Sequence, residues 1–245
     1  MERGVLVASD SHMEWLLPWW WERYSSSNAL PVVFVDFGMS LKMKSWCQER
    51  GVVIHLEERS FPKEISKEWS CSYGDSYLQA RQAWFKKPLA CLLSPFEETV
   101  WIDLDCEILS SIESIYQVLE KDKEIGVALD PLGFVSEEIP SAFNSGVIVF
   151  RKNSLLIQRW ARLCLQESDQ YWSDDRVLSA VIHEFQEKVV ILPPIYNWRI
   201  SEGVPFYAKI IHWCGEWGKA YIVSHGGLKE SLQKFPVLQG IFETK

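Results

Sequence analysis

The apolar residues at the start of the chain fall into short runs separated by longer mixed segments. The runs cover 4–9, 31–37 and 52–56, a length typical of buried strands. The segments between them, up to residue 24 and from 40 to 50, have the length and composition of helices. Strand, helix, strand and helix at this spacing predict a parallel sheet covered by helices.

The rest of the chain continues this alternation after a mixed, polar segment at 60–76 that we predict to be irregular. The predicted helices are about 77–93, 113–121, 154–167, 173–185 and 228–234, the predicted strands are 125–129, 142–150 and 189–192, 94–96 is a turn, and 210–223 is strand and loop. No repeat or linker interrupts this order. We therefore expect one α/β domain with a mixed, mostly parallel sheet.

Three aspartates stand at the carboxyl ends of predicted strands: Asp10, Asp36 and Asp103. Right-handed crossovers place the carboxyl ends of parallel strands along one edge of a sheet. Open α/β sheets bind their ligands at that edge. We therefore expect these three side chains to border a ligand site.

The apolar run at 99–109 is interrupted by two aspartates one residue apart, Asp103 and Asp105. Side chains alternate along a strand, so both carboxylates would share one face and repel each other unless a cation lies between them. Mg²⁺ or Mn²⁺, with their preference for oxygen ligands, would meet this need. The alternative interpretation is a pair of aspartates that caps a turn or a following helix.

Composition narrows the possible partners. With 47% hydrophobic and 24% charged residues in 245 positions, the chain is typical of a globular protein. A net charge of −8 argues against nucleic acid as a partner, because binding a phosphate backbone needs a basic surface. A small anionic substrate stays possible, because a metal ion and one or two lysines can reverse the charge locally.

Six scattered cysteines include no Cys-x-x-Cys pair, which predicts buried free thiols and a reducing compartment. The first residues lack the apolar stretch of a signal peptide. Apolar runs of roughly 18 residues, as a membrane span needs, are absent from the sequence. We expect a soluble, cytoplasmic protein.

Four further segments carry candidate chemistry. Phe143-Asn144-Ser145-Gly146-Val147 opens an apolar strand, and its glycine permits a close approach to the backbone. Asp174-Asp175 stands at a predicted helix start, where an N-cap is the simpler explanation. Residues 210–219 end a strand with His212 and continue into a glycine-containing loop with Lys219, which suits a metal ligand and a phosphate contact. Lys86 and Lys87 precede Pro88, a residue that interrupts or kinks helices.

Taken in this order, the segments resemble the retaining GT-A-fold glycosyltransferases of the glycogenin and galactosyltransferase type, glycosyltransferase family 8. That family has an N-terminal strand with a donor-binding loop, a basic residue before an Asp-x-Asp strand, Phe-Asn-Ala/Ser-Gly-Val, Asp-Gln, and His-x-x-Gly-x-x-Lys. The matching positions are 5–10, Lys86 or Lys87, Asp103-Leu104-Asp105, 143–147, Asp174-Asp175 and 212–219.

Three positions depart from the family's pattern. Asp175 replaces the glutamine, two lysines stand where the family has an arginine, and Lys219 follows His212 by seven residues rather than six. These departures indicate a divergent branch.

The resemblance implies transfer of a hexose from a nucleotide-diphosphate sugar to a hydroxyl of a glycan or other acceptor, with retention. A nucleotide-binding part would cover about 1–106 and an acceptor-binding part about 107–245. It also implies Mn²⁺ or Mg²⁺ held by Asp103, Asp105 and His212, with His225 as the alternative histidine. Donor contacts would come from Ala8, Ser9, Asp10, Asp36, Lys86 or Lys87, Leu104, Gly215 and Lys219, and Asn144 and Asp174 would face the sugar.

Two other functions stay open at this point. A haloacid-dehalogenase-type phosphatase would use Asp103 as its nucleophile and a later acidic pair. Against it, Glu107 stands where that family has Thr or Val, and its Asp-x-Asp is generally near the N-terminus. A carbohydrate-binding protein without catalysis is the other alternative, since the 13 tryptophans offer flat rings for stacking on sugars. Among these, we single out Trp198, Trp213 and Trp217, which lie near other candidate residues.

Overall fold

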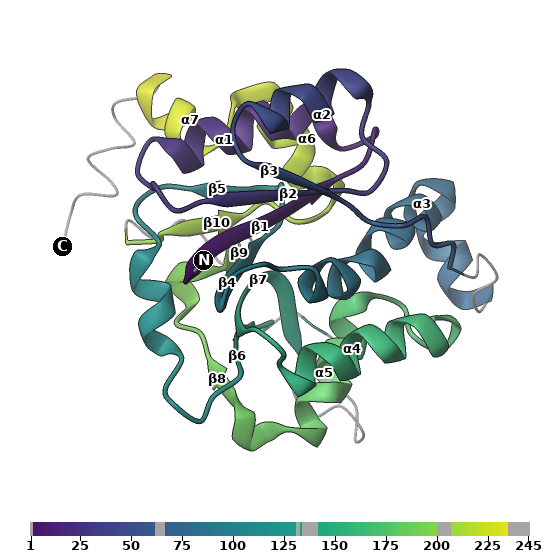
Figure 1. Ribbon diagram of the computed structural model, residues 1–245. Helices are drawn as coiled ribbons and strands as arrows, with labels where there is room; N and C mark the ends of the chain where they lie inside the picture. The colour runs from purple at the N-terminus through teal and green to yellow at the C-terminus, as the bar shows by residue number, and fades with distance from the viewer. Residues whose placement is uncertain (1, 62–66, 131–132, 134–141, 200–206, 235–245) are drawn as a thin grey trace.

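The computed structural model describes residues 2–61, 67–130, 133, 142–199 and 207–234, and at 67–78 and 232 only the backbone. Its centre is a seven-stranded sheet with the order β3-β2-β1-β4-β7-β6-β8 (Figure 1). These strands are β1 (Arg3–Ser9), β2 (Val32–Asp36), β3 (Val52–His55), β4 (Glu98–Ile102), β6 (Ile125–Leu129), β7 (Phe143–Arg151) and β8 (Val189–Ile191).

Strand β7 alone runs antiparallel to its neighbours in this sheet as described: β3, β2, β1 and β4 pair in parallel, β6 pairs in parallel with β8, and β7 opposes β4 and β6. The prediction of a mixed, mostly parallel sheet is therefore confirmed. Because β7 is reversed, its amino end lies beside the carboxyl end of β4. The sheet joins strands from both predicted parts of the chain, and the division at about 106 stays a prediction.

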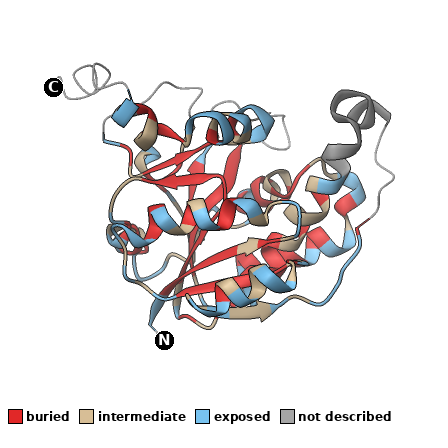
Figure 2. Ribbon diagram, turned by 90° about the horizontal axis from the view of Figure 1, so that it is seen from above, coloured by how far each residue is buried: buried red, intermediate tan, exposed pale blue. Residues whose placement is uncertain are grey.

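Alternation along the strands divides the core into two layers. Val5 and Val7 of β1 belong to one apolar cluster, and Leu6 between them belongs to the other. Figure 1 shows the corresponding helices: α1, α2, α6 and α7 cover one side of the sheet, and α3, α4 and α5 cover the other. Figure 2 shows the strands as the most deeply buried part of the molecule and the outer helix surfaces as exposed.

The helices connect these strands along the chain. The α-helices are α1 (Leu17–Ser25), α2 (Leu41–Gln48), α3 (Lys67–Leu92), α4 (Leu155–Gln166), α5 (Asp174–Glu184), α6 (Gly215–His225) and α7 (Leu228–Lys234), and the 3₁₀ helices are η1 (Glu14–Leu16), η2 (Glu113–Val118), η3 (Ser168–Gln170), η4 (Gln186–Lys188) and η5 (Pro194–Tyr196). None of the described helices is both long enough and apolar enough to cross a membrane.

A second, three-stranded sheet carries part of the candidate site. It has the order β5-β10-β9, from Cys106–Ile108, Ile210–His212 and Trp198–Arg199. In its register, His212 of β10 lies opposite Cys106 of β5 and beside Arg199 of β9. The short β9 was not predicted, since two residues give no periodic signal.

Two segments differ from the prediction. Helix α3 begins at Lys67, within the segment predicted to be irregular, and it continues past Pro88 to Leu92. Its first ten residues include Gly, Asp and three Ser. These residue types have weak helix propensity, and so the sequence did not predict this part of the helix. The predicted helix at 113–121 is the 3₁₀ helix η2, which ends at Val118.

The predicted loop after His212 is instead helix α6. Glycines count against a helix in sequence reasoning, because they cost about 1 kcal/mol each in its interior. Here Gly218 has a packing reason: a Cβ at this position would overlap the backbone of Trp213. The close approach of α6 to the chain that precedes it explains the glycine.

The cysteines whose side chains are described are free thiols, as predicted. Cys214 is half-buried, and the four buried ones are Cys47, Cys91, Cys106 and Cys164. The side chain of Cys71 lies outside the described residues.

Candidate active site

The Asp-Leu-Asp segment forms a turn between two sheets. Strand β4 ends at Ile102, and the Cys106 N–H, at the start of β5, donates to the Asp103 carbonyl oxygen at 3.1 Å. The Asp103 N–H donates to the Gly146 carbonyl oxygen at 2.8 Å. The prediction of two carboxylates on one strand face is therefore wrong, because the turn replaces strand alternation at this point. Each carboxylate has its own set of partners.

The first set, the Lys87 cluster, comprises Lys87, Trp101, Asp103, Ser145 and Asp174. Lys87 Nζ lies 2.9 Å from Asp103 Oδ2, 3.5 Å from Asp174 Oδ2 and 2.9 Å from Ser145 Oγ. Trp101 Nε1 donates to Asp103 Oδ1 at 2.7 Å. Burial alone would lower the pKa of Lys87, but the attraction of Asp103 and Asp174 raises it above its ordinary value. The lysine is therefore a fixed positive charge.

Asp174 is the fully buried carboxylate of this cluster. It is buried at the start of α5 and accepts a hydrogen bond from Ser145 Oγ at 2.8 Å. Burial raises the pKa of Asp174 to about 7, with Asp175 and Asp103 adding to the shift and Lys87 and Ser145 opposing it. Asp174 thus takes up or releases a proton near neutral pH.

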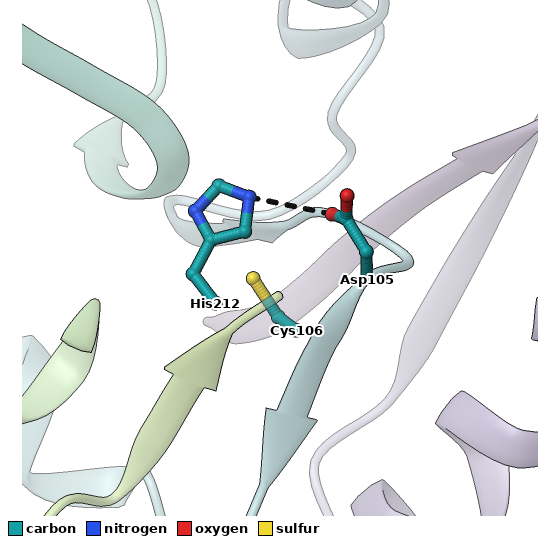
Figure 3. Close-up of side chains that lie close together, drawn as sticks. All are labelled: Asp105, Cys106 and His212. Atoms are coloured by element: carbon teal, nitrogen blue, oxygen red, sulfur yellow. Dashed lines mark ion pairs between the residues drawn. The ribbon is translucent and has the colours of Figure 1, made fainter. Parts of the chain in front are cut away.

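The second set, the His212 cluster, comprises Asp105, Cys106, His212 and Lys219. His212 Nε2 lies 3.3 Å from Asp105 Oδ1, and Lys219 Nζ lies 2.7 Å from Asp105 Oδ2. Figure 3 shows the His212 ring facing the Asp105 carboxylate with the Cys106 sulfur beside both. Burial alone would raise the pKa of Asp105, but Lys219 and His212 lower it well below its ordinary value.

The neighbours of His212 fix the proton on its ring. Asn144 Oδ1 accepts from the Gly146 N–H at 2.9 Å and from Asn197 Nδ2 at 2.8 Å, which identifies it as the amide oxygen. His212 Nδ1 lies 3.0 Å from this oxygen and 3.0 Å from Asn197 Oδ1, and so it carries a proton. In the neutral ring, the Nε2 lone pair then faces the carboxylate of Asp105, an arrangement that a cation between them would stabilise.

Gly146 gives the histidine ring its place. A Cβ on this residue would overlap the ring of His212 and approach Asn144 Oδ1. The sequence suggested that this glycine permits a close approach to the backbone, and the structure shows that His212 makes it. Gly146 is therefore part of the support for His212.

Buried Glu107 anchors the segments on both sides of α6, the helix that carries Lys219. Its carboxylate accepts from Trp213 Nε1 at 2.9 Å and from the N–H groups of Leu228 and Lys229 at 2.7 and 2.9 Å. Burial raises the pKa of Glu107, and these donors oppose the shift. The same residue that departs from the phosphatase motif thus caps α7 and holds it against β5.

The predicted donor-binding residues lie at the carboxyl ends of β1 and β2. Asp10 Oδ1 accepts from the backbone N–H groups of His12 and Met13, a capping arrangement. The buried Asp36 carboxylate accepts from the Gly38 and Met39 N–H groups and pairs with Lys44 at 2.6 Å. Burial would raise the pKa of Asp36, but Lys44 and the two backbone donors lower it to about 2.

The remaining predicted residues are placed as follows. Ser9 is buried and donates to the Asp10 carbonyl oxygen, and Ala8 beside it is half-buried. Leu104 is buried in the core cluster, and Gly215 begins α6 with a positive φ of 80° and open space at its Cβ position. Lys86 donates to the Phe37 carbonyl oxygen at 3.3 Å, whereas its neighbour Lys87 enters the carboxylate cluster. The structure thus distinguishes the two lysines.

His225, the alternative metal ligand, has other partners. Its ring stacks on Tyr221 with centroids 4.5 Å apart, and its Nδ1 lies 2.7 Å from Ser224 Oγ. Among the described residues, the group of three metal-binding side chains with ligand atoms within 4.8 Å of one another is Asp105, Cys106 and His212. Asp103, held by the Lys87 cluster, is not in this group.

The candidate tryptophans differ in exposure. Trp213 is buried and stacks on Tyr221 at 4.5 Å, whereas Trp217 is 63% exposed. Trp198 is half-buried on β9, with its ring 6.1 Å from that of Tyr207.

Sequence reasoning missed two residues that lie at His212. Asn197 follows Pro193-Pro194 in a non-periodic segment, so nothing in the sequence connects it with His212. Cys106 is adjacent to Asp105, but it was interpreted only as a buried thiol. The register of β5 with β10 brings Cys106 to the histidine.

Solved structures share this architecture. LgtC, a galactosyltransferase solved with donor and acceptor sugar analogs, is 13% identical, with a TM-score of 0.63 over 99% of this chain and 97% of its own. GlyE, a glycosyltransferase of Streptococcus pneumoniae TIGR4, is 14% identical, with a TM-score of 0.60 over 88% of this chain and 56% of its own. Mouse xyloside xylosyltransferase 1 is 16% identical, with a TM-score of 0.55 over 88% and 98%.

The chain has the GT-A glycosyltransferase fold. At these identities the likeness shows the fold alone. No protein-family model matches the sequence, and neither does any curated protein, so membership of glycosyltransferase family 8 stays a prediction. The structural likeness does not favour the phosphatase, since these structures are glycosyltransferases and the Asp-x-Asp follows β4 rather than the first strand.

Proposed function

We propose that the protein is a metal-dependent glycosyltransferase that moves a hexose from a nucleotide-diphosphate sugar to an acceptor hydroxyl, with retention at the anomeric carbon. The observation that carries the proposal is the geometry of Asp105 and His212. Two amide oxygens bind the Nδ1 proton of His212, and its Nε2 faces the carboxylate of Asp105 at 3.3 Å, in the turn that follows β4 of a GT-A fold.

These residues suit a divalent cation. Asp105 and His212 would hold Mn²⁺ or Mg²⁺ with Asp103, whose carboxylate would have to turn away from Lys87. When bound, such an ion supplies Lewis-acid charge to the diphosphate oxygens of the donor. The rest of the chemistry falls to the side chains of the two clusters.

Lys219 and Lys87 would stabilise the negative charge that develops on the departing diphosphate. Lys219 is the better placed of the two, because its side chain is 29% exposed whereas that of Lys87 is 5% exposed. Ala8, Ser9 and Asp10, with the loop after Asp36, would meet the base and ribose. Leu104 and Gly215 would lie near the diphosphate.

Asn144 would contribute to the reaction by orienting His212. Its side-chain oxygen lies 3.0 Å from Nδ1 of the ring and also accepts from the Gly146 N–H and from Asn197 Nδ2. Asp174, beside Lys87, would face the sugar and carry a proton for part of the time at neutral pH. Glycosyl transfer passes through an oxocarbenium-like state. None of the described residues stands out as a nucleophile, and we infer front-face attack assisted by the leaving phosphate.

The proposal is tested by binding of nucleotide diphosphates and nucleotide sugars with and without Mn²⁺. A ligand at a hundredfold excess over its Kd should stabilise the protein by about 2.7 kcal/mol. Asp105→Asn should abolish this metal-dependent stabilisation, whereas Asp122→Asn, at an exposed turn, should retain it. Nucleotide affinity that is equal in Asp105→Asn, in EDTA and in the unaltered protein would refute the metal role. NMR of the glycoside formed would report the anomeric configuration.

A further inference from the structure

Cys106 is the member of the His212 cluster that the proposed function does not use. Its sulfur lies within 4.8 Å of both a carboxylate oxygen of Asp105 and a ring nitrogen of His212. Its hydrogen-bond acceptor is the Gly146 carbonyl oxygen, at a long 3.8 Å. Thiolates select zinc and other softer metals rather than Mn²⁺ or Mg²⁺, and so neither of these ions explains a sulfur at this place.

We propose that Asp105, Cys106 and His212 form a binding site for Zn²⁺, in which the Cys106 sulfur coordinates as a thiolate. Oxygen, sulfur and nitrogen are the three ligand types that Zn²⁺ takes in proteins. The proposal does not depend on glycosyl transfer. Because Asp105 and His212 are shared with the Mn²⁺ or Mg²⁺ site proposed above, Zn²⁺ would compete with those ions.

The distance between the two non-sulfur ligands suits zinc. Two ligand atoms about 2.0–2.1 Å from a tetrahedral ion are separated by roughly 3.3 Å. His212 Nε2 and Asp105 Oδ1 are 3.3 Å apart. Three protein ligands leave a fourth position for water or substrate, as in zinc sites that are not purely structural.

The surroundings already orient two of the ligands. Asn144 and Asn197 accept the Nδ1 proton of His212 and so leave Nε2 as the coordinating atom. Lys219 holds Asp105 Oδ2 at 2.7 Å and leaves Oδ1 turned toward the ring. Support of this kind around the direct ligands typically changes metal affinity about 10- to 100-fold.

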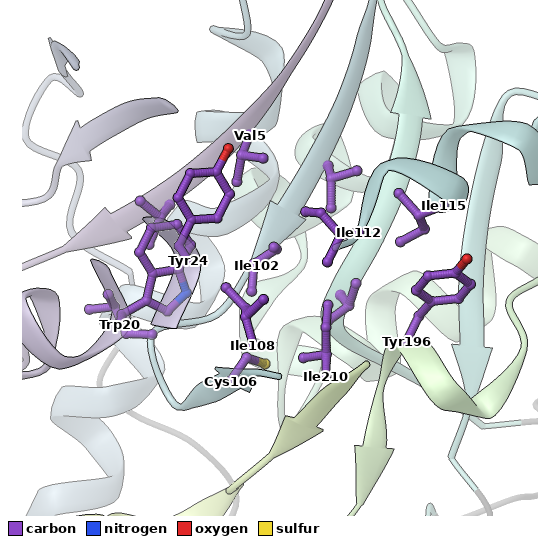
Figure 4. Packing of buried hydrophobic residues seen from close by; sticks show 14 of the residues in the cluster. Val5, Trp20, Tyr24, Ile102, Cys106, Ile108, Ile112, Ile115, Tyr196 and Ile210 are labelled. Atoms are coloured by element: carbon purple, nitrogen blue, oxygen red, sulfur yellow. The ribbon is translucent and has the colours of Figure 1, made fainter. Parts of the chain in front are cut away.

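The sulfur of Cys106 is shielded from solvent. Cys106 is fully buried, and Figure 4 shows it among the apolar side chains of Ile102, Ile108 and Ile210. Zinc binding replaces the thiol proton, which leaves to solvent, so one proton is released for each ion bound at Cys106. The thiolate then adds a second negative charge beside that of Asp105, whose other oxygen Lys219 contacts.

The same three ligands favour Zn²⁺ over Mn²⁺. Zn²⁺ binds nitrogen and sulfur ligands more tightly than Mn²⁺ does, as the order of first-row divalent ions predicts. Cys106→Ser should therefore weaken Zn²⁺ binding while it leaves Mn²⁺ binding unchanged. The contrast separates a sulfur ligand from a general loss of structure.

The experiment titrates the metal-free chain with Zn²⁺ against a chromophoric chelator, and with Co²⁺ as a spectroscopic probe, in the absence of nucleotide. We expect one Zn²⁺ per chain and a thiolate-to-cobalt absorption in the near ultraviolet. Cys106→Ser and Cys106→Ala should lose that absorption and at least about tenfold in Zn²⁺ affinity. Cys164→Ser, which alters another buried thiol in α4, is the matched control and should retain both.

Two results would overturn the zinc proposal. One is an unaltered chain that binds no Zn²⁺, and the other is a folded Cys106 variant with the affinity and cobalt spectrum of the unaltered chain. If the Cys106 variants fail to fold, X-ray absorption of the zinc complex of the unaltered chain decides the question, because it reports whether a sulfur binds the metal. Glycosyltransferase activity enters none of these measurements, so a failure of the proposed function is recognised separately.

Discussion

The Lys87 cluster and the His212 cluster each take one aspartate from the same turn and one lysine from a helix, yet they balance charge differently. Lys87 is buried between Asp103 and Asp174 and contacts both. Lys219 is partly exposed and holds one oxygen of Asp105, while His212 faces the other. In the first cluster one buried lysine contacts both carboxylates. In the second the lysine occupies only Asp105 Oδ2, and Oδ1 faces His212 Nε2, a pair of ligand atoms that a divalent cation could join.

This difference assigns separate tasks to the two halves of the turn. A buried charge without a partner costs free energy of folding, so we expect the intact Lys87 cluster to be required for the stability of the fold. The His212 cluster keeps a ring nitrogen directed at a carboxylate, which suits ligand binding more than folding. The predictions below test this division.

The largest effect is expected from removal of Lys87. Lys87→Met would leave buried Asp174 and half-buried Asp103 without their cation and should lower the free energy of unfolding by about 3–5 kcal/mol. Lys219→Met should cost only about 1 kcal/mol, since its side chain is 29% exposed and Asp105 keeps His212. Urea denaturation of both variants measures the difference. Equal losses would remove the distinction between the clusters.

An intermediate effect is expected at Asn197. Asn197→Ala removes one of the two amide oxygens that fix the proton of His212 Nδ1, and should weaken divalent-cation binding about 10- to 100-fold. Asn28→Ala is the control, because that amide supports Ile112 rather than His212. Titration calorimetry with Mn²⁺ compares the two variants. Unchanged affinity in Asn197→Ala would show that the ring needs no such support.

The third effect concerns pH. The pKa of Asp174 is raised to about 7 in the folded chain, from about 3.9 when unfolded, so the folded state binds the additional proton between these values. Its contribution to stability is therefore fully present below about pH 4 and is lost as the pH rises through 7. In Asp174→Asn this decline of the unfolding free energy should disappear. In Asp169→Asn, at an exposed position, it should persist.

Thermal or urea denaturation at several pH values measures this dependence, and the difference between the curves of the two variants isolates Asp174. A slope in Asp174→Asn equal to that of the unaltered chain would contradict the altered protonation.

The sequence was sufficient for the fold class and for most strands of the main sheet. The runs at 4–9, 31–37 and 52–56 correspond to β1, β2 and β3. Buried parallel strands need continuous apolar stretches, which explains β1 and β2, whereas β3 is a partly exposed strand at the edge of the sheet. The segment at 143–147 was recognised as the start of a strand. Its place beside Asp103 follows from the reversal of β7, which the local pattern does not encode.

The sequence also placed His212 and Lys219 near Asp105, through the resemblance to glycosyltransferases rather than through periodicity. It misread the segment between them as a loop, since glycines lower helix propensity whatever their packing role. Within α6, Gly218 lies where a Cβ would overlap the backbone of Trp213, a packing role that composition alone does not reveal.

By itself, then, the sequence determined which segments are buried strands and which residue types are available for chemistry, because both follow from local composition and spacing. Only the tertiary structure decided that Asp103 and Asp105 have different partners, that Lys87 rather than Lys86 joins the carboxylates, and that Cys106 and Asn197 lie at His212. These pairings join residues far apart in the chain. They are set by strand order, register and the turn after β4, which no local pattern specifies.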